Sequence, residues 1–269
     1  MENHAQFLGT KQRWNRNPTT IIYKIYIMEK LFLIFAMLAS MAVSAQIIVF
    51  HPVKVPAELN EKFLDIELNY SQKTAQDAVN KGQLEGWALL KNTNPKPDGY
   101  NYIWVNVYKD IASAVNEGGW WNNSKDVVGV ETPLLFSIFD YIEMDRRYFY
   151  KQDITLPSIA AAGYVILNFS NSDQVDTHLK ELEKYVLPHF KKEMRKHGMV
   201  GFGVASKITP QGEDVATMMT YDSYDSLENA MIHLSGGGVI SGLPSDKITN
   251  IPWTMRPLMK VMGSTVPKE

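Results

Sequence analysis

Two stretches of the chain, GWALLKNTNPKPD at residues 86–98 and GFGVASKITPQGE at residues 201–213, decide the fold because they follow one pattern. Each begins with a glycine and a large aromatic residue, continues as a short apolar run, and ends in a proline-containing turn before an acidic residue. The two stretches lie 115 residues apart, from 86 to 201, and the match extends without a gap from residue 64 to residue 104. A repeat of this length predicts that one supersecondary unit occurs twice in the chain.

Hydrophobic periodicity and turn residues predict six elements in the second copy. They are strand, helix, strand, strand, helix and strand, over residues 162–169, 172–197, 199–208, 215–221, 224–234 and 253–262. Ser172 is suited to cap the first of these helices, because its hydroxyl can accept from a backbone N–H. Pro188 predicts a kink near Tyr185, and Gly198 predicts a left-handed residue that ends the helix.

The first copy predicts the same order of elements. Its strand, helix, two strands, helix and strand fall at residues 47–55, 57–81, 84–91, 100–108, 110–116 and 146–154. Before its last strand this copy carries a longer insertion, residues 118–141. The predicted class is α+β, with the order β-α-β-β-α-β in each copy.

This order is the ferredoxin-like unit, and two such units in one chain resemble the dimeric α/β-barrel superfamily. The resemblance covers residues 46–265 and also rests on a short pattern of tyrosine, glycine and aromatic residues. The pattern is carried by Tyr70, Gly82, Gly86 and Trp87, and in the second copy by Tyr185, Gly198, Gly201 and Phe202. It implies two ferredoxin-like repeats, residues 46–155 and 156–269, packed as a single-chain pseudo-dimeric α/β barrel.

The resemblance does not decide the function. The superfamily includes cofactor-free quinol oxygenases, haem-degrading and haem-binding enzymes, lactone isomerases and proteins without an assigned activity. The chain carries no catalytic signature that selects one of them. Because one fold supports many chemistries, whether the protein is an enzyme stays open.

Residues 28–45 have the features of a secretory signal peptide. Lys30 gives a short basic start, residues 31–43 form an apolar core, and small residues stand at −3 and −1 of a cleavage site after Ala45. The apolar run is shorter than the roughly 20 residues of a membrane span, so we expect no span in the mature protein. We expect a periplasmic or secreted protein whose leader is cleaved or kept as an anchor, and residues 1–27 to precede the true start.

Composition excludes several classes of function. The chain has no cysteine, which excludes disulfides, a thiol nucleophile and a thiolate metal site. It has 27 basic and 29 acidic residues; residues 1–45 hold five and two of them, which leaves 22 against 27 in the mature protein. A mildly acidic protein is not expected to bind nucleic acid, because phosphate binding needs a basic surface.

The first copy places aromatic and polar residues on one strand face. By alternation, Tyr102, Trp104, Asn106 and Tyr108 share a face, and Trp87 lies on the neighbouring strand. Large rings mixed with polar groups are typical of a ligand pocket. The alternative is that the same rings only fill the space between two layers.

The insertion and the strand after it supply further candidates. Trp120 and Trp121 follow two glycines, and this pair fits either a lid over a pocket or a cover for one end of a barrel. Arg147 lies among acids and tyrosines, where a buried arginine would hold an anionic ligand. The alternative for this segment is an exposed edge strand whose charges prevent aggregation.

The histidines predict no metal site, because no pair has the spacing of metal ligands on a helix. His178 lies at the edge of the predicted helix. In haem-handling relatives of this architecture a histidine on such a helix can reach the iron, so the resemblance makes haem an option through His178. The alternative is a half-exposed helix histidine with no such role.

We therefore expect an exported protein that binds a small apolar or aromatic ligand between sheet and helices. One alternative is a cofactor-independent oxygenase or isomerase, or a haem-handling enzyme. Another is a protein that docks a partner through its insertion and has no pocket. The sequence identifies neither the ligand nor the oligomeric state.

Overall fold

The computed structural model describes residues 46–116, 119–208 and 211–267, and residues 45–269 form one compact unit. The predicted leader and the residues before it lie outside the described residues. The described part contains no helix that is long and apolar enough to span a lipid bilayer.

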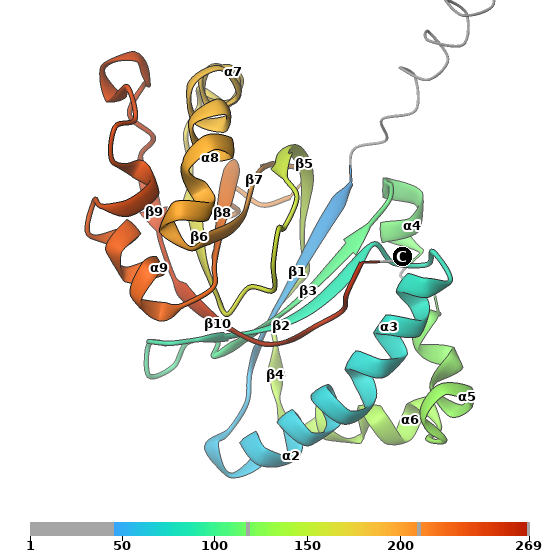
Figure 1. Cartoon of the computed structure of the whole chain (residues 1–269). Coiled ribbons are helices and arrows are strands. Elements are labelled where there is room, and N and C mark those ends of the chain that lie inside the picture. The colour runs from blue at the N-terminus through green and yellow to red at the C-terminus, as the bar shows by residue number, and fades with distance from the viewer. Residues whose placement is uncertain (1–45, 117–118, 209–210, 268–269) are drawn as a thin grey trace, which may run out of the picture. The chain divides into compact units, whose positions relative to one another are not determined.

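The strands of the unit belong to one antiparallel sheet that closes on itself (Figure 1). They are β1 (Ile47–Lys54), β2 (Gly86–Asn92), β3 (Tyr102–Tyr108), β4 (Glu143–Met144), β5 (Tyr148–Leu156), β6 (Tyr164–Ser170), β7 (Met199–Lys207), β8 (Met218–Tyr224), β9 (Trp253–Met255) and β10 (Leu258–Ser264). The order is β10-β2-β3-β1-β5-β7-β8-β6, and β10 also pairs with β6. This last pairing closes a barrel, to which β4 adds beside β1 and β9 beside β6.

Helices cover the outer faces of both halves of the barrel (Figure 1). They are α2 (Asn60–Ile66), α3 (Gln72–Asn80), α4 (Ile111–Val115), α5 (Ser124–Val128), α6 (Thr132–Leu135), α7 (Val175–Glu181), α8 (Leu187–Glu193) and α9 (Leu227–Leu234). The strands of the first half lie in the order β2-β3-β1-β5 and those of the second in the order β7-β8-β6-β10. Along the chain the first half reads β1, α2–α3, β2, β3, α4 and β5, with α5, α6 and β4 inserted before β5, and the second half reads β6, α7–α8, β7, β8, α9 and β9–β10.

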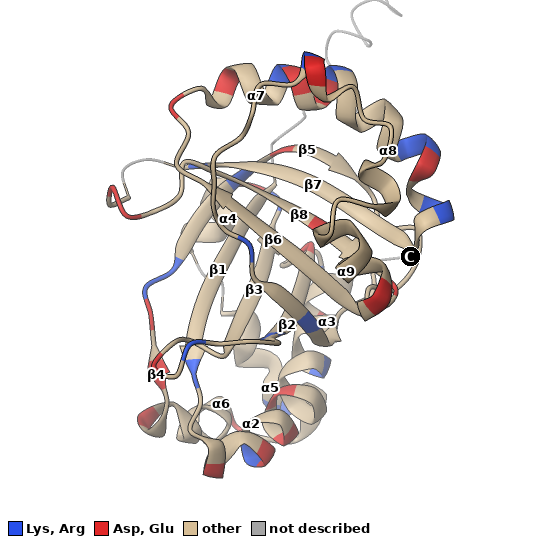
Figure 2. Ribbon diagram, turned by 90° about the vertical axis from the view of Figure 1, so that its left-hand side faces the viewer, with Lys and Arg blue, Asp and Glu red and all other residues tan. Residues whose placement is uncertain are grey.

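Strand alternation divides the buried side chains into three apolar clusters. One fills the barrel interior, with Phe50, Tyr150 and Met219 among its members. The other two lie between the sheet and the helices of each half. Figure 2 shows the charged residues gathered on the helices and loops, with few on the barrel strands. The sheet–helix layer of the first half contains the predicted aromatic face.

The long helix of each half contains a π-helical turn. In the first half a 3-10 turn (Ala57–Leu59), α2, the π turn Glu67–Ser71 and α3 replace the single predicted helix. In the second half the π turn Leu182–Val186 separates α7 from α8. That turn includes Tyr185 and lies just before Pro188, which has no N–H for the helical ladder. The π turn thus lies where the kink was predicted.

Three local predictions were wrong. The last strand of the second half is divided into β9 and β10 around Pro257, which cannot donate a ladder hydrogen bond. Ser172 is not the helix cap; the cap is Gln174, whose backbone N–H donates to the Ser172 hydroxyl at 3.0 Å. The segment after Arg147 is not an edge strand, because β5 pairs with β1 on one side and β7 on the other.

Candidate functional site

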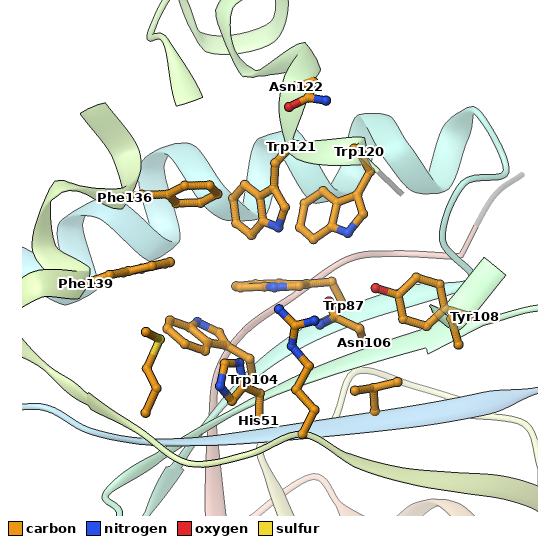
Figure 3. A pocket seen from close by; sticks show the side chains of 15 residues that line it. His51, Trp87, Trp104, Asn106, Tyr108, Trp120, Trp121, Asn122, Phe136 and Phe139 are labelled. Carbon is orange, nitrogen blue, oxygen red and sulfur yellow. The ribbon is translucent and has the colours of Figure 1, made fainter. Parts of the chain in front are cut away.

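The sheet–helix layer of the first half encloses a partly open cavity of about 450 Å³. Strands β1, β2 and β3 form its floor, the insertion its roof, and the segment between β4 and β5 one rim (Figure 3). The lining residues are Val49, His51, Trp87, Trp104, Asn106, Tyr108, Ala114, Gly119, Trp120, Trp121, Asn122, Phe136, Phe139, Met144 and Arg147.

Strand register brings the floor residues together. Asn106 of β3 pairs with Val49 of β1 on one side and with Trp87 of β2 on the other. Two residues along, Trp104 pairs with His51. Because residues directly opposite in antiparallel strands share a face, these five side chains must point into one layer.

The roof is a chain of touching aromatic rings. Trp120 and Trp121 stack with centroids 4.0 Å apart, and Phe136 packs edge-on against Trp121 at 5.6 Å. Phe136 also stacks on Phe139 at 4.9 Å, and Phe139 lies 5.4 Å from Trp104 in the floor. In Figure 3 the two tryptophans lie side by side over Trp87, and the phenylalanines close one end. The cavity therefore presents flat apolar walls on facing sides.

Hydrogen bonds hold the roof in place. Asn123 donates from its side chain to Asp77 of α3, which ties the insertion to the helix layer. Thr132 donates to the backbone carbonyl of Trp121 at 2.9 Å, and Ser124 donates to that of Val130 at 2.8 Å. The roof is thus a folded element rather than an open loop, and its rings have defined positions.

Two polar groups of the floor face this apolar space. Burial, and then the positive charge of Arg147, lower the pKa of His51, so its imidazole is neutral at pH 7. A hydrogen bond to the backbone of Asp145 opposes that shift. The Oδ1 atom of Asn106 is buried and accepts no hydrogen bond from the protein. A buried acceptor without a donor is uncommon, which makes Asn106 a place where a ligand would donate.

The rim and the far end of the cavity add a cation and a phenol. Arg147 lines the cavity with an exposed side chain. Tyr108 is buried and its hydroxyl accepts a hydrogen bond from Trp120; burial raises the pKa of Tyr108 despite this bond. The site thus combines a guanidinium at its mouth with neutral groups inside.

A carboxyl group lies directly behind the floor. Glu67 is 1 % exposed, and the indole N–H of Trp104 donates to its Oε2 at 2.8 Å. Burial raises the pKa of Glu67 to about 7, although hydrogen bonds from Trp104 and Ser71 favour the charged form. The sequence analysis missed Glu67, because a carboxylate on an amphipathic helix is expected to face solvent.

Seven of the nine predicted site residues line this cavity. They are Trp87, Trp104, Asn106, Tyr108, Trp120, Trp121 and Arg147. Tyr102 is not among the lining residues; it is buried, donates to Asn60 at 2.5 Å, and packs on Phe63 at 5.0 Å. Three other lining residues were not predicted: His51, Phe136 and Phe139. His51 had a signal, since alternation from Val49 places it on the same face.

His178 lies in the other half and does not line the cavity. It is 1 % exposed, and its Nε2 hydrogen bonds with Ser172 Oγ at 2.8 Å. An axial haem ligand needs that nitrogen free to face the iron, so this geometry does not fit a haem held by His178. Among the described residues no group of histidine and carboxylate side chains is placed to hold a metal ion.

The insertion does not present an exposed tryptophan pair. Trp120 is 2 % exposed and Trp121 is half-buried, because both rings face the cavity. A docking protein with no pocket, which would expose this pair, does not agree with that geometry.

The matching strand positions of the second half hold a polar network. Asp222 of β8 pairs with Ile166 and Phe202, as Asn106 does with Val49 and Trp87 in the first half. Asn168 donates to Asp222 at 2.6 Å and Arg256 donates to Asn168 at 2.6 Å. Burial raises the pKa of Asp222.

Helix α9 completes that network. His233 Nδ1 hydrogen bonds with the hydroxyl of Tyr224 at 2.6 Å, and its Nε2 lies 3.7 Å from Asp222. Burial lowers the pKa of His233. Protein groups satisfy one another here, whereas in the first half Asn106, which lines the cavity, has a buried Oδ1 with no hydrogen-bond partner in the protein.

Comparisons with known proteins find likeness in structure only. The sequence matches no protein-family model and no curated protein. A "putative monooxygenase" of Fusobacterium nucleatum superposes with a TM-score of 0.52 at 10% identity, covering 82% of this chain and 94% of that one. A "putative monooxygenase" from Lactobacillus acidophilus superposes with a TM-score of 0.53 at 12% identity, covering 84% of this chain and 98% of that one.

A chlorite dismutase mutant from Candidatus Nitrospira defluvii also resembles the chain, with a TM-score of 0.44 at 7% identity, covering 82% of this chain and 92% of that one. Such low identities show the fold alone. The fold is mixed α+β with an antiparallel barrel and outer helices, as in the dimeric α/β-barrel superfamily.

Proposed function

We propose that the cavity of the first half binds one planar aromatic small molecule that carries a hydrogen-bond donor and an acidic group. The observation that supports this most is a cavity of about 450 Å³ walled by tryptophan and phenylalanine rings around the unpartnered Oδ1 of Asn106. Its volume falls in the range of roughly 300–1,000 Å³ that small-molecule sites occupy.

The walls select flat apolar ligands. Trp120 and Trp121 form one wall and Trp87 and Trp104 contribute to the other. Aromatic rings stack in offset or edge-on arrangements, which contribute roughly 0.5–1.5 kcal/mol beyond the apolar area that they bury. A fused aromatic ligand between the walls would stack against the rings of both.

The polar groups select the substituents. A hydroxyl or amine on the ligand would donate to Asn106 and relieve the cost of its buried acceptor. Arg147 at the rim favours a carboxylate or an ionised phenol, because a guanidinium pairs with such oxygens in a two-pronged geometry.

The test compares three probes by tryptophan quenching and calorimetry. We expect 2-naphthol and 2-naphthoate to bind more tightly than naphthalene, and Trp104→Ala to weaken all three by about tenfold or more. Trp253→Ala is the matched control, since Trp253 lies on β9 away from the cavity and its loss should not change the affinities. Equal affinities of the Trp104→Ala variant and the unchanged protein would contradict the proposal.

A second candidate function is cofactor-independent oxygenation of such a ligand, and His51 favours it. A neutral imidazole in the cavity is suited to remove a proton from a hydroxyaromatic substrate, and Arg147 is suited to stabilise the resulting oxyanion. The ionised hydroxyaromatic is itself the reductant: with a quinol and dioxygen the O–O bond breaks, one oxygen atom enters the ring to give a hydroxyquinone, and the other leaves as water. The superfamily fold supplies no argument of its own here, because fold does not determine activity.

Oxygen uptake with 1,4-dihydroxynaphthalene tests this candidate. We expect consumption above the spontaneous rate, lost in His51→Gln while 2-naphthol still binds. Binding of 2-naphthol without any protein-dependent oxygen uptake would leave ligand binding as the function.

Two further features of the sequence analysis stay proposals. The two halves are copies of one ferredoxin-like unit, which the π turns at residues 67–71 and 182–186, again 115 residues apart, support. The protein is exported, with cleavage after Ala45. The intact mass of the protein recovered from its host would test export, since cleavage after Ala45 gives a chain that starts at Gln46.

A further inference from the structure

We propose that Glu67 is a positioning residue of the cavity, which holds the indole of Trp104 in place as the wall that a ligand stacks against. The inference rests on the proposed ligand-binding function, whose site it extends by one residue behind the floor. Glu67 does not line the cavity and would not touch the ligand.

Trp104 connects Glu67 to the cavity, because it lines the cavity and also contacts Glu67. Its ring lies 5.4 Å from Phe139, 5.5 Å from His51 and 5.8 Å from Phe63, so apolar and aromatic groups surround it. Its single polar atom, Nε1, donates to Glu67 at 2.8 Å in a fully buried hydrogen bond. Ring packing alone permits an indole to turn or slide, whereas a buried hydrogen bond to a carboxylate fixes its orientation.

The backbone places Glu67 for this purpose. Glu67 is the first residue of the π turn Glu67–Ser71, where one extra residue per turn redirects the side chains that follow. The matching π turn of the second half begins with Leu182, a buried apolar residue. A carboxyl group is therefore not needed to form the turn.

The residue equivalent to Trp104 also differs between the two halves. Strand register matches Trp104 of β3 to Thr220 of β8, because each lies two residues before the position that pairs with β1 or β6 at Val49 or Ile166. The gapless repeat, which matches residue 104 to residue 219, was therefore wrong by one residue on this strand. The first half thus combines glutamate with tryptophan beside the described cavity, and the second half combines leucine with threonine. The shared fold therefore does not require the glutamate–tryptophan pair.

Few other charges act on Glu67. The π turn packs against α5 and β10, whose titratable residues Lys125, Asp126 and Lys260 are all exposed. Tyr102 on β3 donates to Asn60 instead. Burial is the main cause that raises the pKa of Glu67, to about 7, and no charged neighbour contributes to the shift.

Ionisation of Glu67 should therefore change the strength of its hydrogen bond with Trp104 near neutral pH. The N–H of Trp104 bonds about twice as strongly to a carboxylate as to a neutral carboxylic acid. Lowering the pH from 8 to 6 protonates Glu67 and weakens this bond. We expect the affinity for 2-naphthol, which stays uncharged over this range, to fall by about fivefold.

Three variants separate positioning from mere structure. In Glu67→Gln the amide oxygen still accepts from Trp104 but is neutral at every pH, so we expect the affinity at pH 8 to equal that of the unchanged protein at pH 6, about fivefold weaker, with no dependence on pH. In Glu67→Leu the acceptor is lost, and we expect about tenfold weaker binding at pH 8. Glu61→Gln is the matched control, an exposed glutamate of α2 whose loss should leave the pH profile unchanged.

Two results would overturn the proposal: Glu67→Leu binding 2-naphthol as tightly as the unchanged protein, or Glu67→Gln retaining the full pH dependence. The ligand-free protein distinguishes this failure from failure of the proposed function. If no probe binds, a change in tryptophan emission with a midpoint near pH 7 that Glu67→Gln and Trp104→Phe both abolish still supports the coupling. If the change in emission persists in both variants, the coupling between Glu67 and Trp104 is contradicted.

Discussion

The buried carboxyl of Glu67 should make the protein less stable as the pH rises, and Glu67→Gln should remove this effect. Glu67 has a folded-state pKa of about 7 against 4.5 for an unperturbed glutamate. A carboxyl with a raised folded-state pKa stabilises the fold fully below the unfolded pKa, and this contribution is lost as pH rises through the folded pKa. The window is therefore pH 4.5 to somewhat above 7.

The magnitude follows from the size of that change. A pKa raised from 4.5 to about 7 corresponds to about 3 kcal/mol of unfolding free energy, since a factor of ten is worth about 1.4 kcal/mol. Glutamine keeps the shape and the acceptor for Trp104 but cannot ionise. At pH 8 the variant should be more stable by up to about 3 kcal/mol, and at pH 5 about equal to the unchanged protein.

Urea unfolding followed by tryptophan fluorescence at pH 5 and pH 8 measures this difference. With a slope of about 2–3 kcal/mol per molar, we expect the midpoint of the variant to be higher by about 1 M at pH 8. Equal midpoints at pH 8, or a loss of stability of the same size at both pH values, would refute the assigned burial of this carboxyl.

Three further predictions concern the cavity and the barrel. Asn106→Leu should remove the preference for 2-naphthol over naphthalene in calorimetry without lowering the thermal midpoint, because it replaces a buried acceptor that has no partner. Gly203→Ala should lower the thermal midpoint by about 5 °C in differential scanning calorimetry, because a methyl group there would clash with the ring of Tyr221. Titration with 2-naphthol should give one site per chain, since Asp222 and its partners occupy the matching place in the second half.

The repeat pattern predicted much of the fold because it depends on local chemistry. Apolar periodicity, Gly82 and Gly198 located both long helices to within a few residues, and both glycines have positive φ angles. Errors occurred where a distant pairing decides the outcome. Tyr148 begins a strand paired on both sides, and its second neighbour, β7, comes from the other half of the chain.

The cavity was predicted where strand alternation determines a face, and missed where tertiary packing does. Trp104 and Asn106 share a face by the pleat alone. Phe136 and Phe139 reach the cavity because residues 119–141 fold into short helical turns over the sheet, which no periodicity indicates. Glu67 needs both a π turn and a tryptophan across the layer, and single-sequence patterns report neither.

The insertion supplies the roof of the cavity in the first half. In the second half the segment between α9 and β9 packs Val239 and Ile251 into the layer, and His233 of α9 is buried beside Asp222 and Tyr224. In the first half aromatic rings of residues 119–141 cover the face, and the buried Oδ1 of Asn106 has no hydrogen-bond partner in the protein. A face that the protein closes with its own hydrogen bonds gains stability, whereas an open acceptor costs stability until a ligand donates to it. The two halves share strand order, and their difference in hydrogen bonding is the physical basis of the binding site that we propose in the first.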